Sequence, residues 1–159
     1  MLISDSDCRI LAVNARYPGS VHDSAIFQMS NIRNFLRTEY ENGHKSSHLI
    51  GDSGYALEPW LFTPFLNYEE GSNEVLFNNM LKSARNVIER TNGVLKGRFR
   101  CLSRHRVLNY HPATAAYIIY ACCVLHNIAI KARLAWNEEM NDADIDEEGD
   151  DNVVPAEQF

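Results

Sequence analysis

The sequence lacks the usual features of secreted and membrane proteins. No apolar run approaches the ~20 residues needed to cross a bilayer, and the opening residues, MLISDSDCRI, show no secretory pattern of a basic region followed by an apolar core. The four cysteines form no paired framework, which favours a reducing, intracellular setting. A phosphate-binding glycine loop, a GxSxG nucleophile elbow and internal repeats are also missing. These absences favour a protein of the cell interior that has no membrane contact.

The composition predicts one folded domain followed by an acidic tail. The 159 residues are 45% hydrophobic and 23% charged, which is typical of a globular core. The net charge of −6 seems to argue against a nucleic-acid partner, but the charge is unevenly distributed. Residues 138–159 hold ten acids and no Lys or Arg, so we expect a disordered tail there and a domain over residues 1–137.

One stretch of the domain is strongly basic. Between residues 82 and 106 lie eight basic residues and a single acid, Glu89. A solvated helix face is the simpler interpretation, but this density favours contact with a polyanion such as DNA. The candidate DNA-binding residues are Lys82, Arg85, Arg90, Lys96, Arg98, Arg100, Arg104 and Arg106.

The hydrophobic pattern predicts an α/β sandwich. Cys8–Arg16 is typical of a strand buried on both faces, and His48–Asp52 of a second, shorter strand. We expect a short and then a longer helix over residues 24–40, and a long helix over Asn73–Lys96. A last helix begins near Pro112 and is apolar almost all round, which predicts a central packing helix.

The predicted long helix is amphipathic. Its buried stripe steps by threes and fours through Phe77, Leu81, Ala84, Ile88, Thr91 and Leu95. The opposite stripe is polar and consists of Asn78, Lys82, Arg85, Glu89, Asn92 and Lys96.

Three carboxylates are candidate metal ligands. Asp52 ends the second predicted strand, Glu89 lies on the polar helix stripe, and Asp23 follows a tight turn. Hard divalent cations prefer such oxygen ligands, and a pair of them can activate water for phosphodiester cleavage. Singly, each acid has a simpler interpretation: a helix N-cap for Asp23, a turn acid for Asp52, and an ion pair of Glu89 with Arg85. Cys122 and His126 have helical spacing but too few partners for zinc, so we expect core cysteines there.

Four ordered motifs make the pattern specific. The chain contains ARYPGSVHDSAIFQMS, LIGDSGYALEPWLFTPF, FNNMLKSARNVIERTNGVLKGRFRCL and YIIYACCVLHNIAI. Together they resemble the DDE-superfamily transposase core of the PIF/Harbinger group, and the resemblance covers residues 3–134. It implies an RNase H-like fold and a site of acidic residues for Mg²⁺ or Mn²⁺. The family's acidic positions fall on Asp52, on Glu89 between Arg85 and Arg90, and on Asp23.

One departure from the family is clear. Its first catalytic aspartate lies on a first, central strand that this chain does not contain, and its N-terminal helix-turn-helix region is missing too. Asp5 and Asp7 match a later turn and do not take that role. We therefore expect Cys8–Arg16 and His48–Asp52 to lack a shared neighbouring strand, with exposed edges that reduce solubility.

The resemblance predicts a transposase-derived, metal-dependent DNA nuclease, represented here by its C-terminal part and located in the nucleus alone or in both nucleus and cytoplasm. Asp52 and Glu89 would be catalytic. The missing aspartate favours an alternative, namely a non-catalytic remnant that serves as a DNA-binding or protein-interaction module. A Myb/SANT-like protein is the partner that the family resemblance implies.

Overall fold

The structure, a computed structural model, describes residues 1–18, 20–103 and 108–135. Helices and strands are mixed, which confirms the predicted α/β class. The predicted tail and two candidate DNA-binding residues, Arg104 and Arg106, lie outside the described residues. The elements, in chain order, are β1 (Leu2–Ser4), β2 (Ile10–Val13), α1 (Asp23–Gln28), α2 (Asn31–Glu41), β3 (Leu49–Ile50), β4 (Leu61–Phe62), α3 (Asn73–Arg98), the 3-10 turn η1 (Arg100–Leu102) and α4 (Pro112–Lys131).

The strands form two separate sheets. β1 and β2 pair antiparallel, with Leu2 opposite Val13. β3 and β4 pair in parallel, with Leu49 opposite Leu61. Within the described ranges no strand joins the two sheets. The two predicted strands therefore lie in different sheets without a shared neighbour, as the departure from the family pattern led us to expect.

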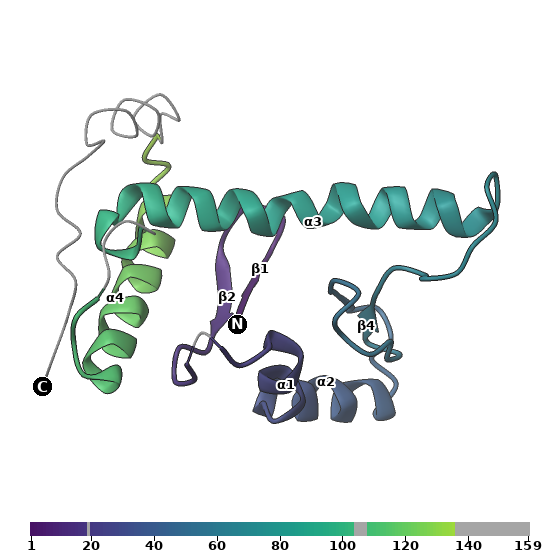
Figure 1. Ribbon diagram of the computed structural model, residues 1–159, viewed down its shortest axis with the longest axis horizontal. Coiled ribbons are helices and arrows are strands. Elements are labelled where there is room, and N and C mark those ends of the chain that lie inside the picture. The colour runs from purple at the N-terminus through teal and green to yellow at the C-terminus, as the bar shows by residue number, and fades with distance from the viewer. Residues whose placement is uncertain (19, 104–107, 136–159) are drawn as a thin grey trace, which may run out of the picture.

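The long helix α3 connects the two halves of the molecule. It runs past both sheets (Figure 1) and contacts β1 and β3. Thr91, which has no solvent exposure, donates its hydroxyl to the Val87 carbonyl at 2.8 Å and contacts Ser4 Oγ at 3.2 Å. Leu81 and Leu95 of the predicted stripe are buried as well, but Ala84 is exposed because it faces the space between the sheets.

Each sheet has its own hydrophobic core. The first core joins Ile10 of β2 to Leu95 of α3 and to the buried Cys122 and Cys123 of α4. The second core gathers Phe27, Trp60 and Leu61 between α1, α2 and the β3–β4 sheet. The two small cores follow from the division into two sheets, because in the described part of the chain no strand carries apolar side chains from one sheet to the other.

The predicted strands are shorter than expected. Only Ile10–Val13 of the first is extended, because Cys8 has a positive φ of 61° that interrupts the strand. The expectation of burial on both faces is wrong, since Leu11 is 59% exposed where the two-stranded sheet has no cover. The strands β1 and β4 were not predicted, since runs of three and two residues are too short for a periodicity to appear.

Helix α4 covers β2 and the end of α3 instead of occupying the centre. Asn127 accepts a hydrogen bond from the Ile10 amide and donates to the Ile10 carbonyl, both at 2.8 Å, and the buried His126 ring contacts the Cys8 carbonyl at 2.8 Å. Its other side is open, with Val124 60% exposed, so the prediction of a central packing helix is wrong.

By length and composition α4 meets the requirements for a membrane-spanning helix, so the expectation that no apolar run is long enough to cross a bilayer is wrong; 28% of the most apolar 18-residue stretch of α4 is buried. Core helices of water-soluble proteins meet the same requirements. The absence of membrane contact therefore stays a prediction.

Candidate active site

An open cleft of about 1190 Å³ separates the two sheets, with α3 forming one wall. Apolar side chains from both sheets and from α3 line much of it, among them Leu2, Ile3, Leu11, Ile50, Val87 and Ile88. All three predicted acids also line this cleft: Asp23 from the start of α1, Asp52 from the loop after β3, and Glu89 from α3. Residues separated by up to 66 positions therefore meet at one surface.

Asp52 is fixed by the turn that it begins. Its Oδ1 accepts the Gly54 amide at 2.8 Å, and its backbone carbonyl accepts the Tyr55 amide at 3.2 Å. Its Oδ2 lies 4.0 Å from Nη2 of Arg85 on α3, and the side chain is 52% exposed. The turn-acid interpretation is thus correct, and it leaves one carboxylate oxygen directed toward α3 and accessible to solvent.

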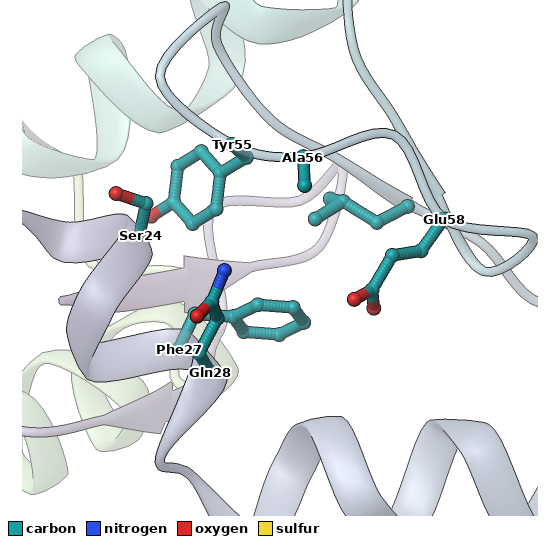
Figure 2. Close-up of a pocket in the computed structure, with 7 residues that line it drawn as sticks. Ser24, Phe27, Gln28, Tyr55, Ala56 and Glu58 are labelled. Carbon is teal, nitrogen blue, oxygen red and sulfur yellow. The ribbon is translucent and has the colours of Figure 1, made fainter.

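Close packing between Gly51 and the Tyr55 ring explains why these two residues are four positions apart in the GDSGY motif. A Cβ at the buried Gly51 would lie 3.0 Å from Tyr55 Cδ2 and 3.3 Å from Leu61 Cδ1, so the backbone approaches the ring closely. The Tyr55 ring also packs edge-on against Phe27 at 5.8 Å between centroids (Figure 2). The loop that carries Asp52, two residues beyond the end of β3 and not at the strand end as predicted, is thereby held against α1, the helix that carries Asp23.

Tyr55 also links the two aspartates electrostatically. Burial is the largest cause that raises the pKa of its hydroxyl to about 12; the charges of Asp23 and Asp52 contribute in the same direction, and Arg85 acts in the opposite direction. Like charges near an ionisable acid disfavour its anionic form. Sequence reasoning did not select Tyr55 as a site residue; its place in the GDSGY motif was the available signal.

The loop after Tyr55 is anchored to α2. Glu58 Oε1 accepts hydrogen bonds from Arg33 Nε at 2.8 Å and Nη2 at 2.6 Å. The cavity in Figure 2, between Phe27, Tyr55 and Glu58, has a volume of about 10 Å³. It has room for at most about one water molecule. This cavity is therefore a packing feature and not a substrate site.

Asp23 is the first residue of α1. The N-cap is His22, so the expectation that Asp23 caps the helix is wrong by one residue. A carboxylate in the first helical turn interacts favourably with the helix dipole. Its Oδ1 lies 3.1 Å from the amino group of Met1, and the side chain is 55% exposed.

Glu89 is exposed one turn after Arg85 on α3. The predicted alternative, an ion pair between these two residues, is not formed within the described ranges, because Arg85 pairs with Asp52 instead. An ion pair with Arg85 therefore does not explain why Glu89 lies on the cleft wall.

The acids have the donor chemistry for Mg²⁺ or Mn²⁺ but do not form a complete site. Both cations prefer carboxylate oxygens. Among the residues that the structure describes, no three His, Cys, Asp or Glu side chains lie close enough together to hold a metal ion. The three acids share a cleft without converging on one point, so no reaction step through a metal follows from this geometry.

The described members of the predicted DNA-binding set divide into three groups. Arg85 and Lys96 line the cleft, and Lys82 and Arg100 are exposed elsewhere. Arg90 donates from Nε to Cys8 Sγ at 3.2 Å, and Arg98 donates from Nη2 to the Leu134 carbonyl at 2.7 Å. These last two have structural contacts that the charge pattern did not indicate.

Comparison with known proteins gives one family. The model of the "DDE superfamily endonuclease" family matches residues 1–127. The chain is 37% identical over 143 residues to the human protein named "Putative nuclease HARBI1", which covers 88% of this chain and 40% of the relative. It is 39% identical over 132 residues to the mouse protein of that name, covering 82% and 36%.

A plant relative matches at a lower level. "Protein ALP1-like" of Arabidopsis thaliana is 30% identical over 141 residues, which covers 80% of this chain and 34% of the relative. The chain thus spans about 40% or less of the length of these relatives. No solved structure gives a significant match.

Proposed function

The chain belongs to the DDE superfamily endonuclease family, and on that premise we propose that it carries the C-terminal part of a metal-dependent DNA nuclease. The supporting observation is the meeting of Asp23, Asp52 and Glu89 at one cleft from three different elements. Family membership supports hydrolysis of DNA phosphodiester bonds, and the cleft indicates where it would occur. The RNase H-like fold is the family's architecture.

The cleft is large enough to hold an additional strand. Strands lie ~4.8 Å apart and sheets are ~10 Å thick, so a six-residue strand of ~20 Å occupies roughly 950 Å³. The cleft measures about 1190 Å³ and is lined by Leu2 of β1 and Ile50 of β3. In the whole protein, an additional strand bearing a fourth carboxylate would join the two sheets and complete the site.

Each residue has a separate role in this proposal. Asp52 and Glu89, with Asp23, would hold Mg²⁺ or Mn²⁺ in the completed protein. The cations supply Lewis-acid activation of water and of the scissile phosphate. The Gly54 amide fixes the Asp52 carboxylate, and Arg85 and Lys96 offset phosphate charge at the cleft. Such phosphate contacts give salt-dependent binding without sequence preference.

DNA cleavage by the full-length gene product tests the proposal. We expect nicking of a supercoiled plasmid that requires Mg²⁺ or Mn²⁺ and falls at least 100-fold in Glu89→Gln. Glu41→Gln is the matched control, since Glu41 pairs with Arg37 on the exposed face of α2. Cleavage that is unchanged by Glu89→Gln would overturn the site assignment.

A second candidate function is a non-catalytic one. The lack of a three-acid cluster in the described part supports it. In this case the basic residues would bind DNA, a Myb/SANT-like partner would supply sequence recognition, and the protein would act in the nucleus. DNA binding by the full-length protein without cleavage in either metal would favour this candidate.

A further inference from the structure

Two thiols lie close together at the junction of α3 and α4. Cys101 in η1 is exposed, and Cys122 in α4 is buried. Their sulfur atoms are 3.9 Å apart. A disulfide requires ~2.05 Å, so closure needs an approach of about 2 Å between a side chain on a short 3-10 turn and one on a helix.

The surroundings give the two cysteines different roles. Burial raises the pKa of the Cys122 thiol to about 11, with further contributions from Cys101 and Cys123. Because thiolates are the reactive species and access controls their oxidation, the exposed Cys101 meets an oxidant first. Cys122 lies beneath it as the resolving thiol. Cys123 belongs to the first core with Ile10 and Leu95, and burial raises its pKa as well.

We propose that Cys101 and Cys122 form a reversible disulfide when the protein meets hydrogen peroxide, the hydroperoxide of the steps that follow. The Cys101 thiolate attacks the peroxide oxygen, the O–O bond breaks, and Cys101 becomes a sulfenic acid while the released hydroxide takes up a proton to form water. The Cys122 sulfur then attacks the sulfenic sulfur, the S–O bond breaks, and a second water leaves with the Cys122 proton. Two thiols are oxidised and one hydroperoxide is reduced.

The bond would fasten the chain after α3 to α4. With both thiols reduced, this junction is held by contacts of Phe99 and Leu102 with the first core and by the hydrogen bond from Arg98 to the Leu134 carbonyl. Cys101 also lines the cleft. Oxidation therefore fixes one end of the cleft wall, and it closes the segment between residues 101 and 122 into a loop.

The test uses the full chain, reduced and then treated with an equimolar amount of hydrogen peroxide. After quenching with N-ethylmaleimide, mass spectrometry should show two fewer alkylated cysteines, a Cys101–Cys122 cross-linked peptide, and reversal by dithiothreitol. Cys101→Ser should abolish the cross-link, and folding of this variant is checked by circular dichroism because the position is exposed. Cys8→Ser should retain the cross-link.

Three results would overturn the proposal. One is four alkylated cysteines after peroxide treatment. The second is a cross-link from Cys101 to Cys123, to Cys8 or to a second chain. The third is a disulfide that still forms in Cys101→Ser.

Discussion

Arg85 of α3 and Asp52 of the loop after β3 face each other at the cleft, with Nη2 and Oδ2 4.0 Å apart. The side chains are 30% and 52% exposed, so solvent screens the pair. Exposed ion pairs contribute about 0–1 kcal/mol to stability. The pair therefore contributes little to the stability of the fold, and its main effect is to position charge at the cleft.

Replacement of Arg85 by alanine should therefore have little effect on stability and a larger effect on DNA binding. We expect the free energy of unfolding in urea to change by less than about 1 kcal/mol. Affinity for DNA in low salt should fall, with a shallower salt dependence, because a phosphate contact is lost. Lys82→Ala, an exposed change on α3 outside the cleft lining, is the control for general loss of charge. Equal effects of the two variants would show that the cleft position has no special role.

The ionisation of Tyr55 reports on both aspartates. Its pKa of about 12 should fall in Asp23→Asn and in Asp52→Asn, and it should rise in Arg85→Ala. The absorbance at 295 nm during alkaline titration measures this ionisation, with Tyr55→Phe identifying the signal. A Tyr55 pKa that none of the three variants alters would contradict the described arrangement.

The same pKa shift predicts how stability depends on pH. An unfolded tyrosine ionises near pH 10, whereas the folded Tyr55 holds its proton to about pH 12. The folded state therefore binds more protons between these values, so the stabilisation is complete below pH ~10 and is lost as the pH rises through that window. Unfolding in urea across this range should show a smaller loss of stability in Tyr55→Phe than in the parent chain.

Gly51→Ala should destabilise the protein, because the added Cβ meets the Tyr55 ring at 3.0 Å and Leu61 at 3.3 Å. Overpacking of this kind costs about 1–3 kcal/mol. Gly93→Ala is the matched control, since a Cβ there meets nothing within 4 Å. Inside a helix this change should add roughly 0.5–1 kcal/mol of stability. Urea unfolding compares the two variants, and a destabilised Gly93→Ala with an unaffected Gly51→Ala would be the contrary result.

Asn127→Ala should weaken the attachment of α4 to β2. Both hydrogen bonds to the Ile10 backbone are lost, and a part-buried amide and carbonyl are left without partners. Each unsatisfied group costs about 1–3 kcal/mol. Val124→Ala, on the exposed side of the same helix, should have an effect below about 0.5 kcal/mol. Thermal unfolding that shows equal shifts for both variants would disprove the anchoring role of Asn127.

The long helices were predictable from the sequence, because their apolar residues recur at regular spacing over several turns. The spacing of Leu81, Thr91 and Leu95 gave α3 its length and buried side, and Pro112 gave the start of α4. The short strands β1 and β4 were missed because their formation depends on pairing partners distant in sequence.

Within the site, position and charge alone left each acid with a simpler interpretation; the resemblance to the family motifs selected the three acids, and all three line one cleft in the structure. Neither the charge pattern nor the resemblance could reveal that Arg85 turns to Asp52 instead of Glu89, since that choice depends on how α3 crosses the second sheet. Likewise, a count of positive charges could not distinguish Arg90, which contacts Cys8, from Lys96 at the cleft.

The central claim is that the acids at the cleft are the protein's share of one divalent-metal site. Binding of Mn²⁺ to the full-length gene product, measured by electron paramagnetic resonance, tests it most directly and without depending on catalysis. We predict that Asp52→Asn and Glu89→Gln each weaken Mn²⁺ binding at least tenfold, while Glu41→Gln on α2 leaves it unchanged. Equal Mn²⁺ affinity in all four proteins would contradict the claim.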